Sequence, residues 1–227
     1  MTVKDIRYSL RALALLLGYP DQTLRGHLAE LLEAMDDEAA IAPARRAEIE
    51  ALVAGLARQN PLDVEARYVE TFDRGRATSL HLFEHVHGDS RDRGPAMIDL
   101  LQTYEKSGLR LAPHELPDHL CVVLEFASTQ PAPVAVEFLG EMAHILNAIF
   151  SALLKRESPY ACLLAAVLEL SGQRVQAVPV LADVPVDESW QEPEAFDGCS
   201  TKGQARPGAE QPIHIVRKTA PSHGATA

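Results

Sequence analysis

The sequence predicts an all-α fold, a single-domain helical bundle over residues 1–172, with an irregular, partly disordered C-terminal tail over residues 173–227. Three observations predict it. Apolar residues recur at helical spacing through most of the first 172 residues. Hydrophobic residues make up 47% of the chain but aromatic residues only 5%, which indicates a Leu-, Ala- and Val-rich core. The 227 residues suit one domain of ordinary size.

Four helices are predicted in the N-terminal part of the chain. Their approximate limits are residues 6–17, 21–35, 43–59 and 61–72. Asp21 and Asn60 are expected to be N-caps, and Pro43 and Pro61 suit first helical positions. The acidic run of residues 36–38 is expected to be a solvated turn.

Further helices are predicted over residues 79–86, 97–104, 116–127, 133–153 and 160–170. The helix 133–153 is the longest of them, and its wide apolar face predicts a central, largely buried position. Helical periodicity ends near Gly172. Trp190 and Phe196 stand alone in the tail, where they are expected either to dock back on the bundle or to meet a partner.

Charge and composition exclude several classes of protein. The formal net charge of −11 argues against a nucleic-acid surface, which would be basic. The three cysteines, Cys121, Cys162 and Cys199, are far apart and indicate neither a disulfide framework nor a zinc knuckle, so we expect a reducing compartment. Runs of eighteen or more apolar residues are missing from the sequence, which predicts no direct membrane insertion.

Residues 74–93 concentrate polar chemistry on a connecting segment, which is typical of binding or catalysis. One interpretation is a metal site, because His81, Glu84 and His85 match the H-x-x-E-H pattern of a zinc hydrolase. The alternative is that these imidazoles are hydrogen-bonded by nearby acidic side chains. Gly88 would end a helix that a zinc protease continues, and this favours the alternative.

A family resemblance accounts for the same stretch. Residues 68–109, YVETFDRGRATSLHLFEHVHGDSRDRGPAMIDLLQTYEKSGL, resemble the nitrate reductase delta-subunit (NarJ) family. The resemblance continues through residues 116–120 and 124–126, returns at Trp190, residues 192–193 and Phe196, and covers most of residues 1–200.

The resemblance implies a molybdoenzyme-chaperone-like fold and a cytoplasmic assembly chaperone that is not an enzyme and holds no cofactor. Such a chaperone binds the N-terminal peptide of the catalytic (alpha) subunit of respiratory nitrate reductase. It holds that subunit, and the alpha-beta complex, competent for molybdenum cofactor and iron–sulfur insertion before membrane attachment. Proteins of molybdenum cofactor biosynthesis are possible further partners. The alternatives are the zinc-dependent hydrolase and a generic helical interaction module.

The implied binding mode is an amphipathic peptide helix in a groove. The expected apolar floor is Tyr68, Phe72, Leu82 and Phe83. The expected polar contacts are Arg74, Glu84, His85, His87, Asp89, Arg91 and Arg93. Since His81, His85 and His87 lie close in sequence, binding is also expected to depend on pH between 6 and 8.

Overall fold

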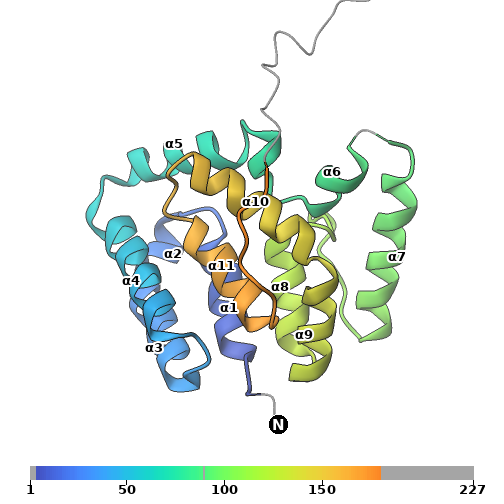
Figure 1. Cartoon of the computed structure of the whole chain (residues 1–227), viewed down its shortest axis with the longest axis horizontal. Helices are drawn as coiled ribbons and strands as arrows, with labels where there is room; N and C mark the ends of the chain where they lie inside the picture. Colours follow the sequence, from blue (N-terminus) through green and yellow to red (C-terminus); the bar gives the residue numbers. More distant parts are fainter. Residues whose placement is uncertain (1–3, 89, 180–227) are drawn as a thin grey trace, which may run out of the picture. The chain divides into compact units, whose positions relative to one another are not determined.

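The computed structural model describes residues 4–88 and 90–179 (Figure 1). Within these ranges all named secondary-structure elements are helices, and β structure is limited to one isolated bridge. The elements are α1 (Arg7–Leu16), α2 (Gln22–Gly26), α3 (Leu28–Glu38), α4 (Pro43–Arg58), α5 (Pro61–Phe72), the 3-10 helix η1 (Arg76–Thr78), α6 (Leu82–His87), α7 (Arg93–Lys106), α8 (Leu120–Thr129), α9 (Ala132–Glu141), α10 (Ala143–Lys155) and α11 (Ala161–Leu170). The predicted all-α class is confirmed.

The core is centred on α11, which packs against α10, α4, α9 and α1. Every residue of α11 except Glu169 is buried. A helix that is apolar on all sides lies inside a protein rather than on its surface, which explains this position. The sequence-based choice of residues 133–153 as the central helix is therefore incomplete, because α11 is buried more completely.

The predicted helix over residues 133–153 is in fact two helices. α9 and α10 meet at Met142 with a 67° bend. The break lets both apolar faces reach the core, since α9 contacts α8 while α10 contacts η1 and α6. Among the described helices, none is long and apolar enough by itself to span a membrane, and α9 with α10 passes that test of length and composition only as a bent pair.

The predicted helix over residues 21–35 is likewise divided, into α2 and α3 at His27. Gly26 weakens the helix just before this break. The solvated turn predicted at residues 36–38 is wrong, because α3 continues through Glu38. The Glu38 carboxylate accepts hydrogen bonds from the backbone N–H groups of Tyr8 and Ser9 at 2.9 and 2.8 Å. Glu38 thus caps the start of α1 from a distant part of the chain.

α7 stands at the edge of the helical region in Figure 1. It is attached through a small separate cluster of buried side chains, Leu100, Tyr104 and Phe126. The Tyr104 hydroxyl donates to the Pro117 carbonyl at 2.7 Å. α7 therefore depends on a few contacts, of which this buried hydrogen bond is one.

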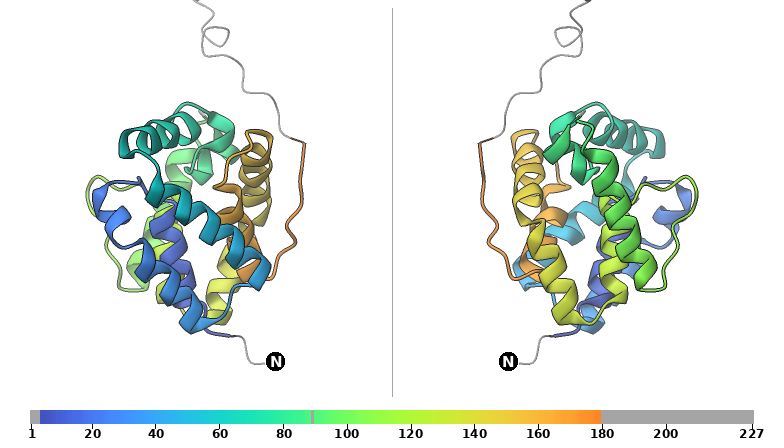
Figure 2. Two further views of the ribbon diagram at one scale, coloured as in Figure 1. Left: turned by 90° about the vertical axis from the view of Figure 1, so that its left-hand side faces the viewer. Right: turned by 90° about the vertical axis from the view of Figure 1, so that its right-hand side faces the viewer.

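After α11 the chain reverses at Gly172, whose φ of 70° is in the left-handed region that glycine adopts readily. Residues 173–179, which we call the strap, then follow α10 in an extended course (Figure 2). Asn147 accepts the Gln176 N–H at 2.8 Å, and the Ser151 hydroxyl accepts the Val178 N–H at 2.8 Å. Trp190 and Phe196, which were expected to pack on the bundle or a partner, lie outside the described residues.

Candidate functional site

The polar segment after α5 is held against the start of α8 by backbone hydrogen bonds. The Leu82 N–H donates to the Asp118 carbonyl at 3.0 Å, and the Leu120 N–H donates to the Leu80 carbonyl at 2.8 Å. His81 and His119 thus form an isolated antiparallel bridge, with ring centroids 5.0 Å apart. This pairing fixes where α6 begins.

Asp118 is the centre of the polar contacts in this region. Its carboxylate has no exposed surface. It accepts the Phe83 N–H at 3.2 Å, contacts His81 Nδ1 at 3.4 Å and lies 3.5 Å from Arg93 Nη2. The buried carboxylate therefore has three donors around it: Phe83 from α6, His81 just before α6, and Arg93 from α7. Glu84 extends the network, because it accepts from the Ser79 hydroxyl at 2.6 Å and from Arg93 Nη1 at 3.3 Å.

We call this set of polar contacts the Asp118 network; its residues are Ser79, His81, Glu84, Arg93 and Asp118. Its electrostatics favour the charged forms of His81 and Asp118. Burial acts to raise the pKa of Asp118, but the hydrogen bonds from His81 and the Phe83 amide and the charges of His81 and Arg93 outweigh it and lower that pKa. The hydrogen bond to Asp118 raises the pKa of His81, against the opposing effect of burial. The Asp118 network is therefore a charge-assisted link between α6, α7 and α8.

The geometry expected for a zinc site is not formed. His81 precedes α6 in an extended conformation, so it does not share a helical face with His85. The His85 ring is hydrogen-bonded through Nε2 to the Ser79 carbonyl at 2.9 Å. Within residues 4–88 and 90–179, no three His, Cys, Asp or Glu side chains are grouped so that they could hold a metal ion.

The residues expected to form an apolar floor lie mainly inside the protein. Tyr68, Phe72 and Leu82 are 6%, 5% and 1% exposed. The Tyr68 hydroxyl donates to the Leu17 carbonyl at 2.7 Å, and its ring packs against Phe72. In this conformation the three side chains are core residues, whereas Phe83 on α6 is half-buried against the Leu100–Tyr104–Phe126 cluster.

The expected polar contacts are divided among different surroundings. Glu84 and Arg93 belong to the Asp118 network, while His87 packs edge-on against Phe83 with centroids 5.7 Å apart. Arg74 and Arg91 are exposed. Asp89 lies outside the described residues. The three histidines thus have separate partners rather than forming one cluster, and their role in binding a partner remains a prediction.

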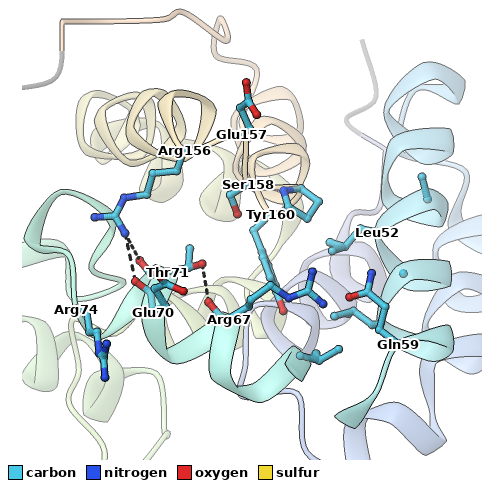
Figure 3. A pocket seen from close by; sticks show the side chains of 15 residues that line it. Leu52, Gln59, Arg67, Glu70, Thr71, Arg74, Arg156, Glu157, Ser158 and Tyr160 are labelled. Atoms are coloured by element: carbon cyan, nitrogen blue, oxygen red, sulfur yellow. Dashed lines mark hydrogen bonds between the residues drawn. The ribbon is translucent and has the colours of Figure 1, made fainter. Parts of the chain in front are cut away.

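A wide concave surface lies elsewhere, between α4, α5 and the connection from α10 to α11 (Figure 3). This groove has a volume of about 840 Å³. We call it the α4–α5 groove. Its lining residues from α4 and the residue after it are Ala51, Leu52, Gly55, Leu56 and Gln59; those from α5 and its end are Val64, Arg67, Glu70, Thr71 and Arg74; those from the connection are Arg156, Glu157, Ser158, Pro159 and Tyr160.

The apolar floor of the α4–α5 groove comes from Leu52, Val64 and Tyr160. Arg67 points across it in Figure 3, and the exposed Arg74 lies at one end. Arg156 donates to the Glu70 and Thr71 carbonyls at 3.2 and 3.5 Å, which ties the α10–α11 connection to the end of α5.

Gly75 makes this tie possible, because a Cβ atom there would overlap the Arg156 guanidinium. Arg74 is the one predicted site residue that lines the α4–α5 groove. The remaining lining residues come from segments about 100 residues apart in the sequence, which only the fold brings together.

Comparison with known proteins decides the family. The family model described as nitrate reductase delta subunit matches residues 37–166, more than half of the chain. The chain belongs to the nitrate reductase delta-subunit family. This match confirms the resemblance seen in residues 68–109, because that whole stretch and α8 lie inside the matched range.

Members of the family share much of this sequence. The chain is 41% identical over 191 residues to the nitrate reductase molybdenum cofactor assembly chaperone NarJ of Escherichia coli (strain K12), covering 84% of this chain and 81% of that protein. It is 38% identical to NarW of the same strain, covering 87% and 82%. A nitrate reductase-like protein, NarX of Mycobacterium tuberculosis (strain H37Rv), is 39% identical over 68% of this chain and 23% of its own length.

The fold has a relative among solved structures. A crystal structure assigned to a redox enzyme maturation protein from Archaeoglobus fulgidus superposes with a TM-score of 0.52 and 18% identity. The match covers 74% of this chain and 94% of that one. It supports the helical fold alone.

Proposed function

We propose that this protein is an assembly chaperone of respiratory nitrate reductase. It binds the N-terminal peptide of the catalytic (alpha) subunit in the cytoplasm and keeps the apo-enzyme, alone or with its beta subunit, open to molybdenum cofactor and iron–sulfur insertion. Family membership and the names of the E. coli relatives support the chaperone role. The protein does this by binding, without a catalytic group or a resident cofactor.

The observation that carries the peptide-binding part of the proposal is the α4–α5 groove. A volume of about 840 Å³ is near the upper end of ligand pockets in proteins and accepts the side chains of one or two helical turns. Ala51 and Gly55 lie one turn apart on the α4 wall and leave room for a peptide backbone to approach. The floor of Leu52, Val64 and Tyr160 offers the apolar surface that an amphipathic helix covers.

Charged side chains at the rim can fix the direction of the peptide. Glu70 on α5 and Glu157 on the α10–α11 connection are exposed carboxylates, and the exposed Arg67 and Arg74 line the same groove. Basic residues of the peptide would pair with the glutamates, and its acidic residues with the arginines. Such rim pairs affect specificity and association rate more than affinity.

The other predicted contacts extend this surface along the chain. η1 begins two residues after Arg74 and packs against α6, which carries Phe83 and His87. We propose that the peptide, or the chain that follows it, continues from the α4–α5 groove over α6 toward Arg91. The Asp118 network would hold α6 and α7 in position for this contact.

The proposal is tested by calorimetric titration of the full-length protein with a synthetic peptide of the catalytic subunit's N-terminus. A scrambled peptide is the control for sequence dependence. Saturable binding of the native peptide alone is expected. Equal binding of both peptides would favour a generic interaction module, and no binding would remove the proposal.

A matched pair of variants tests the groove. Gly55→Leu fills the groove, whereas Ala66→Leu adds the same side chain at an exposed α5 position outside it. We expect Gly55→Leu to weaken peptide binding at least tenfold, about 1.4 kcal/mol, and Ala66→Leu to leave it unchanged. Native affinity in the Gly55→Leu protein would show that the peptide binds elsewhere.

A further inference from the structure

A second concave surface lies between α1, α2, α3 and α8. Its volume is about 450 Å³, within the range of ligand pockets in proteins, roughly 300–1,000 Å³. It shares no lining residue with the α4–α5 groove, so the two surfaces are separate. We call it the acidic pocket, because its charged lining residues, apart from His27, are Asp21, Glu30 and Glu125.

The interior of the acidic pocket is mainly apolar. Leu24 and Leu31 in its lining are buried, whereas Leu15 and Tyr19 are 44% and 48% exposed. Single exposed apolar residues are common on protein surfaces, but two that line one cavity offer a partner apolar surface to bury.

The Tyr19 side chain is held in place before any partner binds. Its hydroxyl donates to Glu65 Oε2 at 3.0 Å, and its ring lies edge-on to Tyr68 with centroids 5.6 Å apart. This wall of the pocket is therefore formed in advance, which lowers the entropy cost of binding.

Carboxylates surround this apolar interior. Asp21 is the N-cap of α2, Glu30 lies on α3 and Glu125 on α8, and all three residues are exposed. The described residues that line the pocket include no Lys or Arg, and His27 Nδ1 lies 3.0 Å from Glu30. The pocket therefore carries an excess of negative charge.

Neighbouring side chains respond to this charge. Desolvation, the hydrogen bond and charge of Glu65, and the charges of two nearby aspartates all raise the pKa of Tyr19. Burial, with a further contribution from the charge of Glu125, raises the pKa of Cys121 to about 12. A cationic group in the pocket would be attracted by the same charges, and an anionic group would be repelled.

The arrangement of the carboxylates indicates what kind of cation fits. A metal ion needs several ligands around one point, and within residues 4–88 and 90–179 no three His, Cys, Asp or Glu side chains are grouped in that way. A Lys or Arg side chain can instead lay its apolar stem on an apolar floor and keep its charged end at a polar rim. A half-exposed tyrosine ring is also a favourable contact for a guanidinium group.

We propose that the acidic pocket is a docking site for a basic amphipathic segment of a partner protein. Basic residues of that segment pair with Glu30 and Glu125 at the rim. A large apolar side chain one helical turn away covers Leu15 and Tyr19. This site goes beyond the proposed function, because it lies outside the α4–α5 groove and selects for a basic segment.

The experiment follows backbone amide signals of the isotope-labelled, full-length protein by NMR. The probe is an alanine-rich helical peptide with arginines and a leucine on one face, and the control peptide has glutamates in place of the arginines. Gly18 lines the acidic pocket and Gly55 lines the α4–α5 groove, so their amides report the two surfaces separately. We expect the arginine peptide alone to shift the Gly18 signal saturably. No saturable shift of Gly18, or equal shifts with both peptides, would overturn the proposal.

Charge reversal at the rim tests the pairing. Glu30→Lys combined with Glu125→Lys changes two exposed positions and should weaken binding of the arginine peptide about tenfold. Glu105→Lys combined with Glu137→Lys reverses two exposed carboxylates outside the pocket and is the matched control, which should bind as the wild type does. Circular dichroism checks that both variants keep native helix content. Unchanged affinity in the first variant, or an equal loss in the control, would overturn the proposal.

Two further titrations separate this site from other occupants. A shift of Gly18 that appears on raising the protein concentration without peptide would assign the pocket to a second copy of this chain and overturn the proposal. The N-terminal peptide of the catalytic subunit should shift Gly55 and leave Gly18 unchanged. A shift of Gly18 alone by that peptide would support the acidic pocket and overturn the α4–α5 groove as its site. If that peptide shifts neither signal while the arginine peptide shifts Gly18, the proposed function fails and the acidic pocket stands.

Discussion

Replacement of Asp118 by asparagine tests the proposed link between α6, α7 and α8. The carboxylate has no exposed surface and receives the Phe83 N–H, the His81 ring and the Arg93 guanidinium at 3.2–3.5 Å. Asparagine keeps nearly the same shape and one acceptor oxygen, but it removes the negative charge and turns an NH₂ group toward a donor. The substitution thus changes the electrostatics without opening a cavity.

The size of the effect follows from the surroundings. Removing one partner of a fully buried ion pair costs about 3–5 kcal/mol, and a hydrogen bond to a charged group contributes about 1.5–3 kcal/mol. The side chains of His81 and Arg93 are 31% and 25% exposed, so water partly replaces the lost carboxylate. The contact distances are also long for charge-assisted hydrogen bonds. We therefore expect Asp118→Asn to lower the free energy of unfolding by about 2 kcal/mol.

Urea denaturation at pH 6, followed by circular dichroism, measures this change. Hydrogen exchange of the Phe83 amide should also become faster, because that N–H donates to Asp118. Asp99→Asn removes an exposed carboxylate from α7 and should change the free energy of unfolding by less than about 0.5 kcal/mol. If Asp118→Asn is as mild as this control, the network does not hold the three helices together.

Three further predictions concern single contacts. Tyr68→Phe removes the buried hydroxyl that donates to the Leu17 carbonyl, and it should lower the free energy of unfolding by about 1 kcal/mol in urea denaturation; no loss would mean that this bond contributes nothing. The raised pKa of His81 contributes stability that is complete below its unfolded pKa of about 6.5 and is lost as the pH rises through the higher folded pKa, so a His81→Asn protein should lose less stability than the wild type between pH 6 and 8; parallel pH profiles would contradict this. Asn147→Ala removes the acceptor of the Gln176 N–H, so hydrogen exchange of the Gln176 amide should accelerate while the α11 amides remain protected. An unchanged Gln176 rate would show that this hydrogen bond does not protect the strap.

The helices themselves could be predicted because their information is local. Asp21 and Asn60 cap α2 and α5 as expected, accepting the Leu24 and Leu62 N–H groups at 2.8 and 3.0 Å. Capping residues and apolar spacing act within one or two turns, and the sequence shows both directly.

The breaks between helices were not predictable in the same way. The apolar stripe continues through Met142, yet the chain bends there because α9 and α10 pack against different neighbours. The extension of α3 through Glu38 was not predictable for a similar reason. The hydrogen-bond donors to Glu38 are the backbone N–H groups of Tyr8 and Ser9, about 30 residues earlier in the chain. Tertiary contacts decide these positions, and local pattern does not report them.

The sequence shows that residues 74–93 are unusually polar, but it does not show that their contacts converge on Asp118. Asp118 stands in the block of residues 116–120 that carried the family resemblance, and an acid two residues before the apolar helix α8 was a signal for it. The α4–α5 groove gave no signal of this kind. Arg67, Arg156 and Tyr160 have unremarkable neighbours in the sequence, and only the packing of α4 and α5 against the α10–α11 connection makes them one surface.

The measurement that tests the central claim most directly is calorimetric titration of the full-length protein with the N-terminal peptide of the nitrate reductase catalytic subunit, with the metal content of the same sample assayed. Saturable binding that the scrambled peptide does not reproduce, at micromolar affinity or better (about −8 kcal/mol), is the result that we predict. Absence of binding, together with one zinc ion per chain, would contradict the chaperone account and direct attention to His81, Glu84 and His85.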